Sequence, residues 1–183
     1  MSQAPKQNDT KMNIKEVKLK LRQVRKEDCR LLWGWVNDAA VRLNSFNSNL
    51  VQWDEHQRWF EQKLTDSNCF IYIILGEYGA PVGQVRFEIG AGGIAEIGIS
   101  IDVLARRKGY ASAALGLSCR RVSRESNIEK VIAHIKQGNK ASTGAFISAG
   151  FIDNGLHIFK GFKVIEMIWL NSKLELEGNS RHD

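Results

Sequence analysis

Along residues 96–124 the spacing of apolar side chains changes from that of a strand to that of a helix. Isoleucine occupies every second position of 97–101, which predicts a strand with one buried face. Apolar residues within 110–124 recur at helical spacing and predict an amphipathic helix. The basic run Arg106-Arg107-Lys108-Gly109 joins the two elements. Because the free amides and dipole at a helix start attract anions, this junction predicts a phosphate site.

Over the rest of the chain, the spacing of apolar residues predicts strands and helices that together make one α+β domain. It predicts strands at 17–21, 69–75, 82–89, 131–135, 151–159 and 164–170, and helices at 27–37, 54–64 and 139–149. The segment 38–52 is predicted to be irregular. Together with the strand at 97–101 and the helix at 110–124, these elements give a mixed sheet of about seven strands and about four helices over residues 16–174. Residues 1–15 are predicted to be a disordered basic tail, and 175–183 a polar tail.

The charge of the chain narrows the choice of partner. The formal net charge is +6, but the first 26 residues hold eight Lys or Arg against two Asp or Glu. The other 157 residues hold 18 of each sign. A basic terminus is usually solvated, so nucleic acid is not an expected partner.

Composition also bears on metals and location. The three cysteines are widely spaced and have no histidine at metal-ligand spacing, so reduced thiols and no metal are expected. No apolar run approaches the roughly 18 residues that span a bilayer. A cytoplasmic protein without a membrane span is therefore predicted.

Two blocks of the sequence resemble the GNAT acetyltransferases over roughly residues 17–172. Arg106-x-x-Gly109-x-Ala111 is similar to their Arg/Gln-x-x-Gly-x-Gly/Ala signature. Farther on, Asn139, Ser142, Phe146 and Gly150-Phe151 stand where the family has an Asn, a small residue, usually a Tyr, and a Gly-Phe pair. The resemblance implies a mostly antiparallel sheet and acetyl-CoA as co-substrate. The coenzyme-binding residues that it implies are Ile101, Val103, Arg106, Arg107, Lys108, Gly109, Tyr110, Ala111, Asn139 and Ser142.

The resemblance also suggests how an acetyl group would be transferred directly to an amine. Glu96 lies on the strand face opposite the isoleucines and can accept the amine proton, although it can equally be a surface residue paired with a cation such as Arg86. Phe146 has no proton to give to the leaving thiolate. Ser142 and water are equal candidates for that acid, and Ser142 can also be a small residue packed under the coenzyme. His134 is expected to be structural.

The acceptor amine is the least determined part of the prediction. The segments 33–48, 56–60 and 83–87 resemble GNAT enzymes that acetylate UDP-linked amino sugars in nonulosonic-acid pathways. This implies a small-molecule acceptor, possibly a sugar nucleotide, bound by Arg42, Asn44, Ser45, Phe46 and Arg86. A protein N-terminus, another small amine, or a non-catalytic acyl-CoA-binding module are the alternatives. A homodimer stays open.

Overall fold

The computed structural model of the chain describes residues 17–171, and the tails predicted at 1–15 and 175–183 lie outside this range. Its sheet has seven strands in the order β1-β2-β3-β4-β5-β7-β6. Their bounds are β1 (Lys20–Gln23), β2 (Cys69–Leu75), β3 (Pro81–Ile89), β4 (Ile94–Ile101), β5 (Lys130–Lys136), β6 (Ile152–Phe159) and β7 (Phe162–Leu170). All neighbours pair antiparallel except β4 and β5, which are parallel. This confirms the predicted α+β fold.

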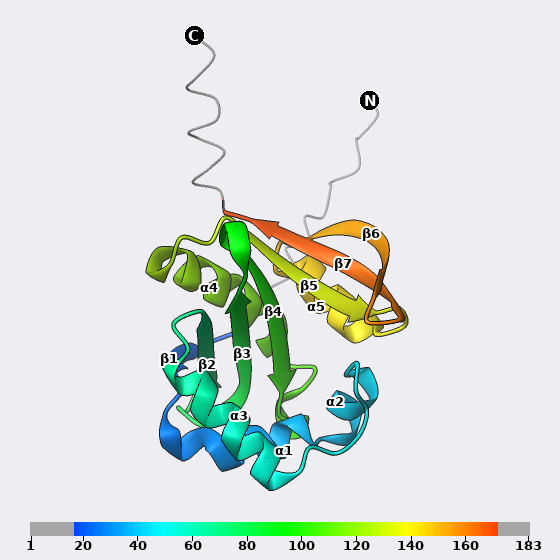
Figure 1. Ribbon diagram of the computed structural model, residues 1–183. Coiled ribbons are helices and arrows are strands. Elements are labelled where there is room, and N and C mark those ends of the chain that lie inside the picture. Colours follow the sequence, from blue (N-terminus) through cyan, green and yellow to red (C-terminus); the bar gives the residue numbers. More distant parts are fainter. Residues whose placement is uncertain (1–16, 172–183) are drawn as a thin grey trace, which may run out of the picture.

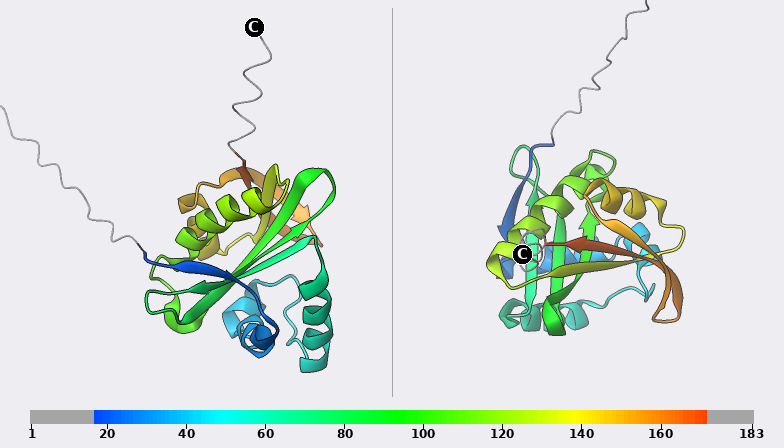
Figure 2. Two further views of the ribbon diagram at one scale, coloured as in Figure 1. Left: turned by 90° about the vertical axis from the view of Figure 1, so that its left-hand side faces the viewer. Right: turned by 90° about the horizontal axis from the view of Figure 1, so that it is seen from above.

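Helices cover both faces of the sheet (Figures 1 and 2). They are α1 (Cys29–Val36), α2 (Ala39–Asn44), α3 (Trp53–Thr65), α4 (Tyr110–Glu125) and α5 (Lys140–Ser148). Short 3₁₀ turns occur at η1 (Lys26–Asp28), η2 (Ala91–Gly93) and η3 (Val103–Ala105). Figure 2 shows α1 and α3 on one face and α4 and α5 on the other.

The burial of β2 explains its continuous apolar run. Tyr72 and Ile74 belong to the larger core, which contains side chains of α4 and α5. Ile71 and Ile73 belong to the smaller cluster under α1 and α3. Both faces of this inner strand are therefore dry, which favours apolar residues at successive positions.

The two parallel strands separate after a short paired stretch. Pairing of β4 with β5 runs from Ile94–Lys130 to Glu96–Ile132, and no later pair is formed. Beyond it the two strands diverge in Figure 1, while β4 stays paired with β3 as far as Ile101. Residues 97–101 and 133–136 therefore face a gap in the sheet instead of each other.

The main correction to the predicted elements is α2. Residues 39–44 were expected to be irregular, and they form a helix that raises the number of α-helices within residues 17–171 to five. The side chain of Asp38 accepts hydrogen bonds from the amides of Ala40 and Val41, so it caps this helix. An Asp before Ala-Ala-Val-Arg-Leu is a start signal that the sequence does contain.

Candidate functional site

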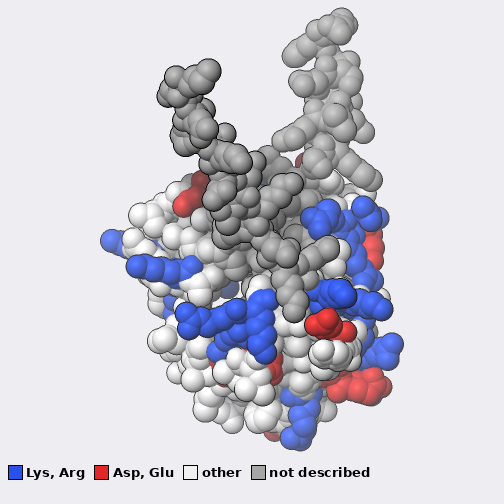
Figure 3. Space-filling model, turned by 180° about the vertical axis from the view of Figure 1, so that it is seen from behind, with Lys and Arg blue, Asp and Glu red and all other residues white. Residues whose placement is uncertain are grey.

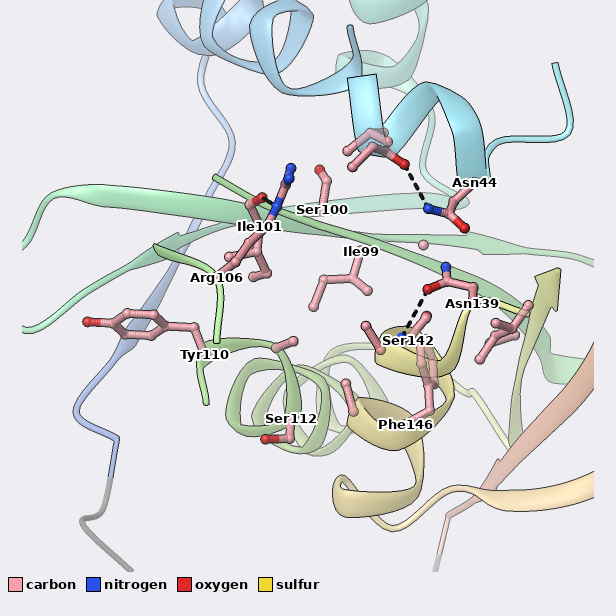
Figure 4. A pocket seen from close by; sticks show the side chains of 18 of the residues that line it. Asn44, Ile99, Ser100, Ile101, Arg106, Tyr110, Ser112, Asn139, Ser142 and Phe146 are labelled. Carbon is pink, nitrogen blue, oxygen red and sulfur yellow. Dashed lines mark hydrogen bonds between the residues drawn. The ribbon is translucent and has the colours of Figure 1, made fainter. Parts of the chain in front are cut away.

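A cavity of about 680 Å³ lies at the divergence of β4 and β5. Its walls are residues 97–101 and 133–136 of the strands, together with α2, the first turn of α4, and α5. Figure 4 shows the cavity between these elements. Every predicted cofactor residue except Val103 and Lys108 contributes to its lining.

The start of α4 has the geometry of an anion site. Gly109 precedes the helix with φ +81°, a left-handed conformation that glycine adopts without steric cost. Arg107 also has positive φ, at 62°, which is uncommon for a residue with a side chain. Among residues 17–171 no acceptor is recorded for the amides of Gly109, Tyr110 and Ala111, and these residues line the cavity. The residues present therefore fit an anionic group such as a pyrophosphate.

The side chains around this turn have different surroundings. Arg107 is exposed at the edge of the cavity, whereas Lys108 is exposed outside it. The hydroxyl of Tyr110 lies next to Gly76, since a β-carbon built on that glycine would be 3.0 Å from it. Figure 4 accordingly shows the Tyr110 ring directed away from the cavity, so only its backbone faces a ligand. Seen from behind, the described surface shows more Lys and Arg than Asp and Glu (Figure 3).

Two other predicted cofactor residues are placed differently from their expected roles. Arg106 lines the cavity, but its Nε donates to the carbonyl of Ile101 (3.0 Å) and its Nη2 to Oδ1 of Asp38 (2.6 Å). Val103 lies in η3 with 60% of its surface exposed, outside the cavity lining.

The cavity wall on α5 is formed by Asn139, Ser142 and Phe146. Asn139 caps the helix, because its Oδ1 accepts from the amide of Ser142 (3.2 Å), and this leaves its Nδ2 for another partner. Phe146 is 2% exposed and packs edge-on against Phe151 with ring centroids 4.8 Å apart. Among the α5 residues that line the cavity, the one with a hydroxyl is Ser142, one helical turn before Phe146.

Glu96 lies on the face of β4 opposite Ile97 and belongs to a polar cluster with His134 and Glu166. Its carboxylate is half exposed, does not line the cavity, and lies 3.6 Å from Nδ1 of His134. The other ring nitrogen of His134 lies 3.4 Å from Glu166, and the ring stacks on Phe159 at 3.8 Å. His134 lines the cavity, and a carboxylate lies beside each of its ring nitrogens, so it belongs to a polar cluster, in keeping with the expected structural role.

Residues 18–152 match the protein family described as "Acetyltransferase (GNAT) domain". The chain belongs to this family. The family prediction is thereby confirmed, and with it the prediction of an N-acetyltransferase. No significant match is found among curated proteins.

Solved structures of acetyltransferases share the fold of this GNAT chain. Spermidine N-acetyltransferase from Vibrio cholerae, in complex with CoA and spermine, has a TM-score of 0.76 and 21% identity, over 85% of this chain and 96% of that one. Aminoglycoside acetyltransferase AAC(6')-Ib in complex with coenzyme A has a TM-score of 0.74 and 16% identity, over 87% and 98%. A domain from Methanocaldococcus jannaschii has a TM-score of 0.72 and 22% identity, over 85% and 100%. None of these comparisons supports the finer resemblance to enzymes of UDP-linked amino sugars.

On the α2 side of the cavity, the predicted acceptor residues Asn44 and Ser45 line the wall. Arg42 does not, because four of its five N–H donors go to its own segment. It donates to the carbonyls of Val36, Asn47 and Asn49 and to the hydroxyl of Ser45. Burial lowers the pKa of Arg42. A role for Arg42 in binding an acceptor phosphate stays a prediction, with one donor left for it.

The two remaining predicted acceptor residues also have partners within the protein. Phe46 packs against Phe159 and Phe162 with ring centroids 5.1 and 5.7 Å apart, which attaches its segment to the turn between β6 and β7. Arg86 pairs with Glu88 at 3.1 Å and lies over the ring of Trp59, so the suggested pairing of Arg86 with Glu96 is wrong. Arg86 lines a second cavity, of about 230 Å³, between α1, α3 and β3.

Sequence reasoning missed the polar pair that lies between the two cavities. Gln84 lines the smaller cavity and donates through Nε2 to the hydroxyl of Ser100 (3.2 Å), which lines the larger one. The side-chain oxygen of Gln84 is buried and has no hydrogen-bond partner among the described residues. Position 84 alternates with Val85 along β3, and that pattern places it on the face of Ser100, but the pairing register is needed to bring the two together.

No helix within residues 17–171 is long and apolar enough to cross a membrane. No group of three or more His, Cys, Asp or Glu side chains in the same range is arranged to hold a metal ion.

Proposed function

We propose that the chain transfers an acetyl group from acetyl-CoA to a primary amine on a small acceptor whose other groups are neutral or anionic. An amino sugar linked to UDP is the member of this class that the sequence resemblance favours. The observation that carries the proposal is the lining of the large cavity. Among the described residues it contains the cations Arg106, Arg107 and Lys136, but no Asp or Glu.

The coenzyme end of the cavity supports the donor half of the reaction. Acetyl-CoA would supply the thioester. The amides of Gly109, Tyr110 and Ala111 would bind its pyrophosphate, with the exposed guanidinium of Arg107 beside them. The edge of β4 that β5 leaves unpaired would bind the amide groups of the pantetheine arm, and Nδ2 of Asn139 is free to add a hydrogen bond.

The transfer itself needs little from the side chains. An amine held in the gap beside β4 attacks the thioester carbon, a C–N bond forms, and the C–S bond breaks. The departing thiolate takes a proton, and we assign its delivery to Ser142, which carries the hydroxyl on the α5 wall of the cavity. The ammonium proton leaves toward the half-exposed carboxylate of Glu96, by way of water, because Glu96 itself does not line the cavity.

The structural neighbours suggest polycationic acceptors as the second candidate, since one is in complex with spermine and a second structure of AAC(6')-Ib is in complex with coenzyme A and kanamycin. A polycation needs carboxylates along its binding site. At the acceptor end of this cavity are Asn44, Ser45 and Ser100, together with Lys136, whose charge repels a second amine. This lining favours the neutral or anionic class.

The test is a thiol-release assay with acetyl-CoA and a panel of amines, with product mass checked for one added acetyl group. The panel holds UDP-linked amino sugars, the same sugars without UDP, spermidine, kanamycin and N-terminal peptides. The proposal expects the highest kcat/KM with a neutral or anionic acceptor. A preference for spermidine or kanamycin contradicts the acceptor class. Coenzyme A binding without turnover on any amine contradicts acetyl transfer.

A further inference from the structure

The helix α2 forms a wall of the cavity without burying any side chain of its own. It has six residues, and its Ala40, Val41 and Asn44 face the cavity. A helix of this length is not stable alone in water, and apolar burial is what usually fixes such a helix in place. The position of α2 therefore depends on polar contacts: the hydrogen bonds of Arg42 to the segments before and after the helix, and the contacts at its two ends.

The C-terminal end of α2 is attached to the far side of the gap. Nζ of Lys136, at the end of β5, donates to the carbonyl of Leu43 (3.1 Å). Two residues past the helix, Phe46 packs on Phe159 and Phe162 at the turn between β6 and β7. These contacts hold the end of α2 to the β5–β7 half of the sheet.

The N-terminal end of α2 is attached to the coenzyme turn by one ion pair. Oδ1 of Asp38 accepts from the amides of Ala40 (3.0 Å) and Val41 (3.1 Å) and from Nη2 of Arg106 (2.6 Å). Nε of Arg106 donates to the carbonyl of Ile101, the last residue of β4. Burial alone would raise the pKa of Asp38, but the hydrogen bonds from Arg106 and the helix amides outweigh it and lower the pKa.

The direction of the Arg106 side chain separates it from the anion site. In Figure 4 its guanidinium lies on the same side of β4 as Ser100, whereas Tyr110 and Ser112 of α4 lie on the other side. A second connection runs parallel to it, since Nε1 of Trp35 in α1 donates to Oδ2 of Asp102 (2.9 Å). The turn at 102–109 is thus bonded to both α1 and the cap of α2.

We propose that Arg106 is a positioning residue for the acceptor and not a ligand of the coenzyme phosphates. Its pair with Asp38 couples the turn that holds the coenzyme to the helix that shapes the acceptor end. Ordering of the turn by the coenzyme then fixes α2, so the coenzyme and the acceptor strengthen each other's binding. The kinetic part of this inference rests on the proposed acetyl transfer, but the structural part does not.

Three variants and their contrast separate the possible roles. Asp38→Asn keeps an oxygen that caps α2 but removes the charge that Arg106 binds. Arg106→Gln removes the guanidinium, and the double variant tests whether the two act as one unit. Arg107→Gln, in the same turn, is the contrast, because Arg107 is exposed and no ion pair is recorded for it among residues 17–171.

The first measurement needs no acceptor. Hydrogen exchange of the amides at 40–45 is compared between the wild type and the variants, and coenzyme A affinity is measured by calorimetry. We expect exchange about tenfold faster in Asp38→Asn, in Arg106→Gln and in the double variant alike, because one charge-assisted hydrogen bond is lost in each. Coenzyme A affinity should change less than about threefold in these variants and fall at least about fivefold in Arg107→Gln, whose α2 exchange should match the wild type.

The opposite pattern overturns the inference. If Arg106→Gln weakens coenzyme A about tenfold and leaves the exchange of α2 unchanged, Arg106 is a phosphate ligand. Additive effects of the two substitutions on exchange also contradict coupling. Should Arg106→Gln not fold, Asp38→Asn alone decides between the two outcomes.

The second measurement uses the best acceptor from the panel. Asp38→Asn and Arg106→Gln should raise its KM at least about fivefold with a smaller change in kcat, since the reacting groups stay in place. An unchanged KM in both variants refutes the positioning role even if α2 exchanges faster. Absence of turnover in the wild type would instead count against the proposed function. The hydrogen-exchange comparison would still test the coupling of Asp38 and Arg106, because it needs no acceptor.

Discussion

Substitution of Gly109 tests whether the start of α4 binds a pyrophosphate, and it comes with a matched control. Gly109→Asp and Gly109→Asn add side chains of nearly equal size. Both must adopt φ +81°, and both would place a β-carbon 2.8 Å from Cγ2 of Val17. Asn and Asp tolerate this backbone region better than other residues do. The strain is therefore shared, and the two variants differ in one negative charge.

The charge difference sets the size of the effect. A carboxylate about 5 Å from one phosphate charge costs about 1 kcal/mol at the dielectric constant of water and about 3 kcal/mol at an effective value of 20. At 1.4 kcal/mol per tenfold, this corresponds to a dissociation constant about 5 to 150 times higher for Gly109→Asp than for Gly109→Asn. The ratio should shrink as salt is added, because the site is at the surface.

Calorimetry with coenzyme A and with pantetheine, which lacks the pyrophosphate, is the assay. For coenzyme A we expect the ratio above, and for pantetheine a ratio of about one, since no phosphate is there to be repelled. Equal affinities of the two variants for coenzyme A would refute the anion site at Gly109. An equal loss with pantetheine would show that the charge acts on the protein and not on the phosphate.

Two further predictions follow from single residues. Ser142→Ala should lower kcat at least about tenfold with little change in coenzyme A affinity if Ser142 protonates the thiolate, and an unchanged kcat in stopped-flow turnover would give that role to water. Asp28, whose carboxylate accepts from both ends of the Arg22 guanidinium at 2.6 and 2.7 Å, should stabilise the fold at neutral pH. Burial raises the pKa of Asp28, but the bonds from Arg22 and the amide of Arg25 lower it below the usual value. Its contribution is therefore full above about pH 4 and is lost as the pH falls through the folded-state pKa. Urea unfolding should show Asp28→Asn less stable by about 1–3 kcal/mol at pH 7, and a difference that does not shrink as the pH is lowered below about 4 would contradict the assignment.

Local pattern was enough to predict the elements that hold the coenzyme end. β2 occupies Cys69–Leu75 as its apolar run predicts, and α4 begins at Tyr110, directly after Gly109. These signals are contained in a few adjacent residues, because alternation and a helix start need no distant partner. The family signature lies in the same short stretch, which is why the resemblance found it.

The acceptor end could not be predicted in the same way. The partners of Arg106 and Trp35 there are 68 and 67 residues away along the chain. The sequence around Arg106 is the same whether its guanidinium turns toward the start of α4 or toward Asp38. Likewise, the sequence does not show that Arg42 donates four of its hydrogen bonds to the segments just before and after α2.

The two ends of the cavity differ in how strongly the fold constrains them, and this bears on which residues set the acceptor. The coenzyme end depends on the left-handed backbone at Gly109 and on β4, whose Ala95 and Ile97 are buried in the main core. The acceptor end is formed by α2, which buries no side chain and is held by polar contacts at its ends. Substitutions facing the cavity from α2 therefore cost little stability, since surface changes away from caps and buried bonds are nearly neutral. On the proposed function, acceptor choice can then change at positions 40, 41 and 44 without loss of the fold, provided that Asp38 keeps its pair with Arg106.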